Sequence, residues 1–290
     1  MKILVLGSKG QLGRCLSEQL TSTDHEVIYS SREQIDIADF QVTKSKILEL
    51  SPELIINATA YTAVDKAEKD QKTSNLINHL AVKNIADICN QQGCWLVHLS
   101  TDYVFDGNAN VPYKEHDKPN PQGIYGETKL NGELAILASD CKYIIIRTAW
   151  VFSEYGNNFL KTMLHLGANR DELSIVGDQI GCPTYAQDIA KSIISIFPHL
   201  YLKKDIQGIY HFCGDKPCSW NDFAKVIFTE AKFHGFKIPN SVKSINTIDY
   251  PTAASRPAYS VLDCSKIKSY FGINQSDWML GVKNSIKALI

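Results

Sequence analysis

Apolar runs and amphipathic segments alternate from the start of the chain. The runs lie at 2–7, 26–30, 53–59, 95–101 and 143–150, and they lack the polar alternation of a half-exposed strand. Such runs are typical of parallel strands that are buried on both faces. The segments between them, at 11–20, 38–50, 74–93 and 125–139, have the apolar spacing of helices. Because strand–helix–strand units cross over with one hand, the pattern predicts an α/β fold with a doubly wound parallel sheet over residues 1–150.

The alternation weakens after about residue 150. The stretch 172–184 is rich in glycine and suits only short strands, and 252–267 has the composition of a loop. Residues 219–235 predict a helix, because Ser219 can cap its first turn and Asp222 places an acid there. We therefore expect residues 151–290 to form a smaller, mixed lobe that packs on the first domain, with some segments returning to it.

Composition excludes several classes of partner. The 30 basic and 31 acidic residues give a net charge of −1, and no basic block indicates a nucleic-acid or membrane surface. No apolar run is long enough to cross a bilayer, and the N-terminal segment is typical of a first strand rather than a signal peptide. The eight cysteines are scattered without a C-x-x-C pair. They predict free thiols in a cytoplasmic protein, not a disulfide framework or a zinc site.

A glycine triplet occupies the first strand–helix turn. In "GSKGQLG", Gly7, Gly10 and Gly13 would let backbone amides approach a pyrophosphate at the positive end of the following helix. The position of this triplet predicts a Rossmann-type dinucleotide-binding domain. An acid that binds the ribose diol usually ends the second strand, but here Ser30, Ser31 and Arg32 follow it. Arg32 suits a 2′-phosphate, so we expect NADPH as cofactor, with NADH still open.

A second group of residues predicts reductase chemistry. Tyr125 and Lys129 are four apart on a predicted helix, so the ammonium can lie near the phenol and stabilise its ionised form. Thr101 ends the fourth strand, and ligands of open parallel sheets bind at such strand ends. A tyrosine tuned in this way can donate a proton to a carbonyl oxygen as hydride reaches the carbon.

The order of glycine turn, strand-end threonine and Y-x-x-x-K resembles the short-chain dehydrogenase/reductases, in the extended form with a C-terminal substrate-binding lobe. Further blocks resemble the dTDP-4-dehydrorhamnose reductase family. They lie in order along almost the whole chain: "NATAYTAVDKAE" (57–68), "STDYVFDG" (100–107), "YGETKLNGE" (125–133), "RTAWVF" (147–152), "GNNF" (156–159), "DQIGCPT" (178–184) and "RP" (256–257). Related dehydratases carry Asp-Glu where this chain has Asp102-Tyr103, which favours simple reduction.

The resemblance implies a role for each matching residue. Tyr125 would be the proton donor, Lys129 would bind the nicotinamide ribose, and Thr101 would assist. The cofactor would contact the glycine turn, the end of the second strand and the end of the third, at Gly7, Gly10, Gln11, Leu12, Arg32, Asp36, Ile37, Ala60, Tyr61 and Thr62. Tyr61 departs from the family's usual histidine. The sugar would contact Asp102, Tyr103 and Trp150, and the nucleotide's phosphates Asn158 and Arg256.

The implied activity is NADPH-dependent reduction of the 4-keto group of dTDP-4-dehydro-L-rhamnose to dTDP-L-rhamnose, for cell-surface polysaccharide synthesis. A homodimer is compatible with this reading. Some relatives bind magnesium at a dimer contact through a glutamate of the first helix. The corresponding residue here is Cys15, a poor ligand for a hard cation, so we expect no metal site.

Two alternatives stay open at this point. The chain could reduce another 4-keto sugar nucleotide, such as a precursor of talose or fucosamine. It could also be a non-catalytic, NADP-binding regulatory subunit, as proteins of this fold are for methionine adenosyltransferase. Among single residues, Trp150 could belong to the core instead of the pocket. His98 and His211 lie in apolar strands and are expected to be buried and structural.

Overall fold

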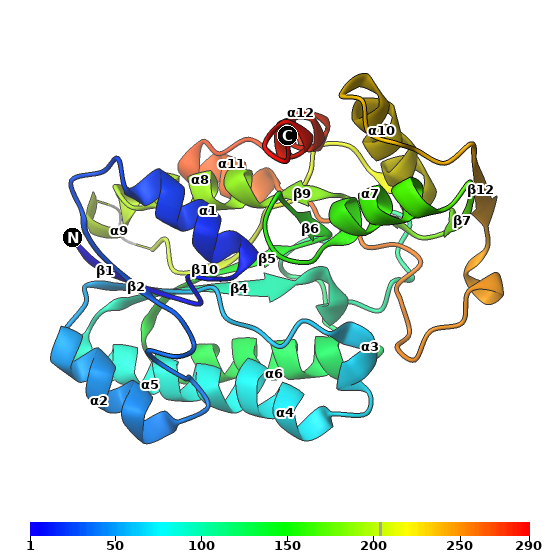
Figure 1. Cartoon of the computed structure of the whole chain (residues 1–290). Helices are drawn as coiled ribbons and strands as arrows, with labels where there is room; N and C mark the ends of the chain where they lie inside the picture. The colour runs from blue at the N-terminus through cyan, green and yellow to red at the C-terminus, as the bar shows by residue number, and fades with distance from the viewer. Residues whose placement is uncertain (203–204) are drawn as a thin grey trace.

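The main element of the fold is a parallel six-stranded sheet. The structure is a computed structural model that describes residues 1–202 and 205–290, and within these the strand order is β2-β1-β3-β4-β5-β10 (Figure 1). The strands are β1 (Lys2–Leu6), β2 (Glu26–Ser30), β3 (Leu54–Asn57), β4 (Trp95–Thr101), β5 (Lys142–Thr148) and β10 (Gly208–His211). All neighbouring pairs are parallel, which confirms the predicted doubly wound α/β fold.

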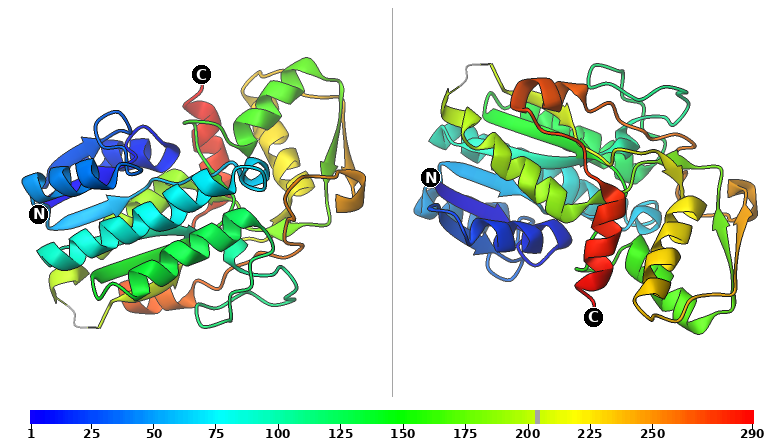
Figure 2. Two further views of the ribbon diagram at one scale, coloured as in Figure 1. Left: turned by 90° about the horizontal axis from the view of Figure 1, so that it is seen from below. Right: turned by 90° about the horizontal axis from the view of Figure 1, so that it is seen from above.

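Helices cover both faces of this sheet, as the lack of alternation in its strands requires. One face packs against α2 (Phe40–Leu50), α5 (Ala81–Gln92) and α6 (Ile124–Leu137), and the other against α1 (Gln11–Leu20), α8 (Ala186–Ile196) and α11 (Ser265–Phe271). Figure 2 shows α5 and α6 side by side across one face. The short helix α9 (His199–Leu202) follows α8. No helix in the described part of the chain has both the length and the apolarity to span a membrane.

The long helix expected at 74–93 is interrupted by a wider turn. Its parts are α4 (Gln71–Asn75), the π-helical turn η1 (Leu76–Leu80) and α5, preceded by the short helix α3 (Val64–Ala67). Within η1, Asn78 accepts a hydrogen bond from the Tyr61 backbone and donates one to the Tyr61 carbonyl oxygen. Gly132 of α6 lies so close that an added Cβ would be 2.2 Å from the Asn78 carbonyl oxygen. The π turn therefore fixes the loop after β3 while α6 packs directly on it.

The second half of the chain divides between the main sheet and a small lobe. Strand β10 adds to β5, whereas a separate core forms around Phe223 and Trp278 at the carboxyl ends of the main strands (Figure 1). The lobe consists of β6 (Val151–Phe152), α7 (Phe159–Asn169), β7 (Glu172–Val176), β8 (Ile180–Gly181), β9 (Thr184–Tyr185), β11 (Cys218–Ser219), α10 (Trp220–Phe233), β12 (Ser241–Ile245), the 3₁₀ turn η3 (Thr247–Asp249) and α12 (Trp278–Lys287). Ser219 caps α10 as expected, and Asp222 completes a capping box with it.

A buried ion pair attaches α6 to the sheet. Arg147 of β5 and Glu133 of α6 are 2 % and 1 % exposed, and Arg147 Nη2 is 2.6 Å from Glu133 Oε2. Arg147 Nε also donates to Glu133 Oε1 at 2.9 Å. The two parallel contacts form a bidentate pair, which fixes orientation as well as distance.

Removing one partner of this pair should destabilise the protein strongly, because the other charge would stay buried without compensation. We expect Glu133→Ala to lower the free energy of unfolding by ~3–5 kcal/mol in urea denaturation. Lys83→Ala, which removes an exposed ion pair to Asp87, is the control and should cost no more than ~1 kcal/mol. Equal losses in the two variants would contradict this role for the pair.

Candidate active site

The candidate site lies at the carboxyl edge of the sheet, where the strand order reverses between β1 and β3. Ligands of open α/β sheets bind at this switch point. The loops after β1 and β3, the 3₁₀ turn η2 (Asp102–Val104) after β4 and the first turn of α6 all meet at this edge. These segments carry many of the residues that the sequence singled out, whereas Arg32, Asp36 and Ile37 follow β2 and the others lie in later segments, at Trp150, Asn158 and Arg256.

The glycine turn after β1 is tight because its three glycines allow it. Gly7 has a φ of +85°, and its N–H donates to the Ser30 carbonyl oxygen. A Cβ on Gly13 would lie 2.2 Å from the Gly7 carbonyl oxygen, so only glycine lets α1 start against this loop. Gly10 is the N-cap residue of α1 and, as a glycine, has no side chain to bond to the first-turn amides. The free amides at this helix end can therefore hold a phosphate.

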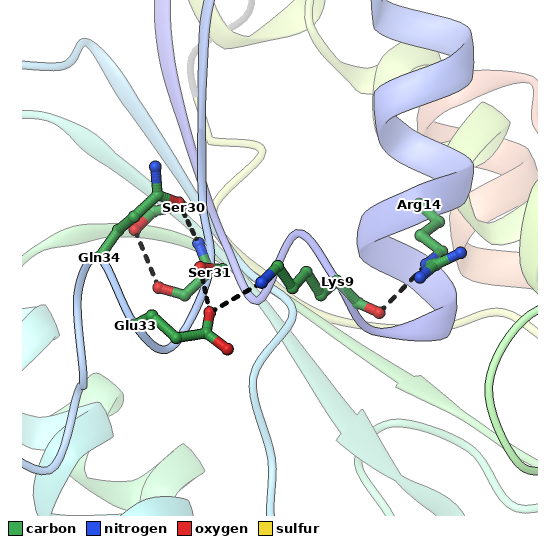
Figure 3. A network of polar contacts seen from close by, with 6 residues as sticks. All are labelled: Lys9, Arg14, Ser30, Ser31, Glu33 and Gln34. Carbon is green, nitrogen blue, oxygen red and sulfur yellow. Dashed lines mark hydrogen bonds and ion pairs between the residues drawn. The ribbon is translucent and has the colours of Figure 1, made fainter.

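Two cations stand beside the end of β2, each paired with a carboxylate. Arg32, with 79 % of its side chain exposed, places Nε 3.2 Å from an oxygen of Asp36. Lys9 donates to Glu33 at 3.1 Å, and Ser31 Oγ donates to the same oxygen (Figure 3). The bond from Ser31, with further bonds from its own backbone and Lys9, lowers the pKa of Glu33 to about 2.

The sequence analysis overlooked Lys9 and Glu33, although each lies within two residues of a position that it named. Lys9 is the third residue of the glycine turn, and Glu33 follows Arg32. A phosphate bound here would contact Lys9 and Arg32 if their ion pairs with Glu33 and Asp36 opened. Glu33 and Asp36 both oppose the negative charge of such a phosphate, whereas Lys9 and Arg32 attract it.

Lys129 is fully inside the protein. It is 2 % exposed, and Nζ donates to the Leu99 carbonyl oxygen at 2.5 Å and lies 3.3 Å from His98 Nε2. Burial lowers the pKa of Lys129 to about 8, while the charge of Glu133 opposes the shift. Burial and the charge of Lys129 hold the pKa of His98 well below its usual range. His98 is thus a neutral, buried partner, in agreement with the sequence analysis.

Tyr125 opens α6 and faces η2. A Cβ on Gly126 would lie 2.2 Å from the Tyr103 carbonyl oxygen, so glycine at this position lets α6 begin directly against the turn. The Tyr103 and Tyr125 rings meet edge to face at 5.5 Å. Burial raises the pKa of Tyr125 to about 12; hydrogen bonding by Thr101 lowers it, and the charge of Asp102 raises it. The Lys129 ammonium faces Leu99 and His98, so the expected tuning of Tyr125 by Lys129 is not what sets this pKa.

Thr101 and Asp102 form a short hydrogen-bonded unit next to Tyr125. Thr101 Oγ donates to Asp102 Oδ1 at 3.0 Å and accepts from the Tyr103 backbone at 3.2 Å. Asp102 is 2 % exposed, and its Oδ2 makes no hydrogen bond of normal geometry with the described residues. Burial raises the pKa of Asp102 to about 7, although the hydroxyls of Ser260 and Thr101 oppose the shift.

The residues expected on the substrate side behave differently from one another. Arg256 makes a bidentate pair with Asp65, at 3.1 and 2.8 Å. Burial raises the pKa of Tyr103, and the charge of Arg256 opposes that shift, which places Arg256 near this site. Trp150 stacks on Trp220 with ring centroids 3.4 Å apart. One face of the Trp150 ring is therefore covered by an aromatic partner that the sequence analysis did not identify, and Trp150 has a φ of +47°.

Asn158 has a structural role that accounts for its whole side chain. It caps α7 by accepting from the Lys161 backbone, and its amide group donates to Gln11 Oε1 at 2.9 Å and to the Ser153 carbonyl oxygen at 2.7 Å. Both amide hydrogens are thus in use. Asn158 connects the start of α1 to the small lobe, and no donor is left over for a phosphate.

The remaining cofactor candidates surround the glycine turn and the end of β3. Gln11 and Leu12 begin α1 and are half-buried, and Ala60 and Thr62 are exposed. Tyr61 donates its hydroxyl to Asp70. Ile37 is 4 % exposed in the core, so only its backbone could contact an adenine.

Cys15, the residue that corresponds to the metal-binding glutamate of some relatives, is also in the core, where burial raises the pKa of its thiol. No group of three potential metal ligands occurs within residues 1–202 and 205–290.

Comparison with known proteins gives a consistent set of relatives. The family described as "RmlD substrate binding domain" matches residues 1–290. A protein of Aggregatibacter actinomycetemcomitans named dTDP-4-dehydrorhamnose reductase is 43 % identical over 98 % of this chain and 97 % of its own length. A crystal structure of a dTDP-4-dehydrorhamnose reductase from Clostridium acetobutylicum has a TM-score of 0.93 and 38 % identity, with 100 % of this chain and 99 % of that one covered. The enzyme of the same name from Bacillus anthracis, in complex with NADP, has a TM-score of 0.91 and 35 % identity, with 99 % of both chains covered.

The close approach of Gly13 to the Gly7 carbonyl oxygen should affect how tightly the cofactor binds. Gly13→Ala must push α1 away from the glycine turn, and overpacking of this kind costs ~1–3 kcal/mol. We expect NADPH to bind correspondingly more weakly in fluorescence titrations. Gly214→Ala, which would place a Cβ 2.1 Å from the Pro183 carbonyl oxygen after β10, is the control and should alter NADPH affinity far less. If both variants lose affinity equally, the effect is one of general destabilisation.

The exposed guanidinium of Arg32 should distinguish the two nicotinamide cofactors. Arg32→Ala is expected to weaken NADPH binding by ~1–3 kcal/mol, the range for a charged hydrogen bond, and to leave NADH almost unchanged. Calorimetric titration with both cofactors measures this difference. Lys44→Ala, an exposed cation on α2, serves as the charge-matched control. An equal loss for NADPH and NADH would show that Arg32 does not contact the 2′-phosphate.

Proposed function

Because the chain belongs to the RmlD substrate binding domain family, we propose that it catalyses the NADPH-dependent reduction of the 4-keto group of dTDP-4-dehydro-L-rhamnose to dTDP-L-rhamnose. The observation that carries the proposal is that Thr101 at the end of β4 and Tyr125 at the start of α6, with Lys129 one turn later, lie at the same edge of the sheet as the glycine-lined start of α1. A phosphate cradle on one side and a half-buried phenol on the other are what a hydride-transfer site to a ketone requires.

The residues present fit a nicotinamide cofactor. The bare first turn of α1 and the space that Gly7, Gly10 and Gly13 leave free would hold the pyrophosphate. Arg32 and Lys9 would hold a 2′-phosphate, and Ala60 and Thr62 would lie along the cofactor after β3. When bound, the reduced nicotinamide supplies the hydride that is added to C4 of the sugar.

In the proposed reaction, the protein supplies the proton and the orientation. Tyr125 donates its hydroxyl proton to the 4-keto oxygen as the carbon is reduced. A phenol with a pKa of about 12 remains protonated at neutral pH and is still a much stronger acid than the alcohol that forms. Lys129, one turn farther along α6, would bind the nicotinamide ribose. The Thr101 hydroxyl stabilises the same oxygen atoms by hydrogen bonding.

The substrate would lie between Tyr125 and the small lobe. Tyr103 and Arg256 would contact the substrate on the side of Tyr125, and the Trp150–Trp220 stack would contact it on the side of the small lobe. We include Asp102 among the sugar contacts and leave Asn158 out, because its amide is committed to Gln11 and Ser153. The proposal also places the enzyme in the cytoplasm, where it would supply polysaccharide synthesis. We also propose that the enzyme forms a homodimer, which light scattering would test.

A direct assay tests the activity. Loss of NADPH absorbance is followed with the dTDP-4-keto sugar and with a panel of other 4-keto sugar nucleotides. Turnover with the dTDP-4-dehydrorhamnose substrate above the rest of the panel supports the proposal. Turnover with another 4-keto sugar nucleotide would reassign the substrate, and NADPH binding without any turnover would favour a regulatory role.

The role of Tyr125 predicts a specific defect. Tyr125→Phe should lower kcat by at least ~10²-fold, the scale for loss of a general acid. NADPH affinity should stay close to that of the parent, because the ring remains in place. The control is Tyr143→Phe. Tyr143 lies at the amino-terminal end of β5, opposite the candidate site, so this variant should keep full activity. Turnover of Tyr125→Phe near the parent level would remove Tyr125 from the mechanism.

A further inference from the structure

The helix that carries Tyr125 begins without a side-chain cap of its own. Gly123 is the N-cap residue of α6, and a glycine has no side chain that could accept a hydrogen bond from the amides of the first turn. The first N–H groups of an α-helix have no partner within the helix, so they need one from elsewhere. Tyr125 is the second residue of α6, and its position therefore depends on what holds this first turn.

Glu68 supplies the missing cap from another part of the chain. Its Oε1 accepts a hydrogen bond from the Ile124 backbone N–H at 2.9 Å. The bonded amide belongs to the residue directly before Tyr125, although Glu68 lies 56 residues earlier in the sequence. The contact combines a hydrogen bond to a charged acceptor with the favourable interaction between a carboxylate and the positive end of a helix.

The glycine at position 123 makes this approach possible. A Cβ there would lie 2.8 Å from Glu68 Oε1, so a larger residue would push the carboxylate out of its place. The backbone of Gly123 is extended, with a φ of −157°, which any residue can adopt. The reason for a glycine is therefore space rather than conformation, and the space is the one that the Glu68 carboxylate occupies.

Glu68 follows α3, a helix of four residues that is itself held by other contacts and lies beside the start of α6 (Figure 1). Asp65 of α3 accepts from the Ala254 backbone at 3.1 Å and pairs with Arg256 through both of its carboxylate oxygens. Ala67 of α3 is fully buried. A helix this short has little stability of its own, so these contacts fix it in place. Glu68 thus holds α6 from a fixed support.

Two contacts therefore hold α6 on either side of Tyr125. The pair between Arg147 and Glu133 fixes the body of the helix against β5, two turns after Tyr125. The bond from Ile124 to Glu68 fixes the helix directly before Tyr125. Without the second contact, the turn that contains Tyr125 would be a helix end that is free to open.

We propose that Glu68 is a positioning residue for the reduction: its carboxylate fixes the first turn of α6 and so keeps the Tyr125 hydroxyl where proton donation requires it. The inference rests on the proposed reductase function. Glu68 neither contacts the ketone nor transfers a proton, and it acts through the backbone of Ile124. General acid catalysis depends steeply on placement, and a shift of about 1 Å can cost ~10²-fold in rate.

Three single variants test this role by their kinetics. Glu68→Ala removes the acceptor, so kcat should fall by at least ~10-fold, while NADPH affinity stays close to that of the parent. Glu68→Gln keeps an oxygen that can accept from Ile124 and should restore most of kcat. Glu127→Ala is the matched control, because it removes an exposed acid from the same turn of α6 and should leave kcat unchanged.

Hydrogen exchange measured by mass spectrometry gives a readout that does not depend on turnover. In Glu68→Ala, the amides of residues 124–128 should exchange faster than in the parent, because their anchor is lost. The second half of α6, which the pair between Arg147 and Glu133 holds, should exchange at the rate of the parent. Glu68→Gln should recover the protection of the first turn. Circular dichroism and a melting curve verify that each variant is folded.

The outcomes separate this inference from the function on which it rests. A parent that oxidises NADPH with no 4-keto sugar nucleotide would overturn the reductase function and the catalytic role of Glu68 with it. An active parent whose Glu68→Ala variant keeps its kcat would overturn the inference alone. It would also be overturned by a loss of kcat that Glu68→Gln does not restore, by a parallel loss of NADPH affinity, or by faster exchange along the whole of α6.

Discussion

The bidentate ion pair between Arg147 and Glu133 fixes the geometry on which the candidate site depends. Arg147 lies on β5 directly beside Ser100 of β4, and the next pair in the register is Thr101 with Thr148. On α6, Tyr125 lies one turn before Lys129 and Glu133 lies one turn after Lys129, so all three point to the same side of the helix. Two short contacts between rigid groups therefore set the helix at a defined height against the strand end that carries Thr101.

Burial fixes the chemistry of the site along with its geometry. The same packing that holds α6 against the sheet raises the pKa of Tyr125 and Asp102 and lowers that of Lys129 and His98. Each shift favours the uncharged form, because a charge in this environment loses its hydration. A site of this kind holds its protons until a reaction creates charge nearby. Proton transfer can then be coupled to hydride addition, because the charge appears where water is already excluded.

Local signals made most of the fold predictable from the sequence. Strands without alternation, a glycine triplet after the first of them and Y-x-x-x-K on the helix after the fourth are properties of short segments, and the structure agrees with each. Some later segments were expected to return to the first domain, but the pairing of β10 with β5 was not predictable, because a strand of four residues does not specify its partner. The π turn at η1 was also not predictable, because the spacing of its apolar residues is close to that of an α-helix.

The side-chain environment of the site was predictable only in part. Residue type and position placed Thr101, Tyr125 and Lys129 together, but the direction of the Lys129 ammonium depends on His98 and Leu99, thirty residues away in the chain. The Trp150–Trp220 stack and the pairing of Arg256 with Asp65 join segments that are even farther apart. Such contacts follow from tertiary packing, and no window of sequence contains both partners.

The joint between the two lobes links cofactor and substrate. Gln11, the first residue of α1, accepts hydrogen bonds from Ser153 and Asn158 of the segment that leads into the small lobe. Gly156 in the same segment leaves room for the Gln11 side chain, with 3.0 Å between an added Cβ and Gln11 Cγ. The helix start that would hold the cofactor phosphates is thus also the anchor of the lobe that would hold the sugar. Because hydride transfer requires the two ligands to meet within bonding distance of the reacting atoms, a shared anchor at their common boundary keeps their relative position independent of movements elsewhere in the lobe.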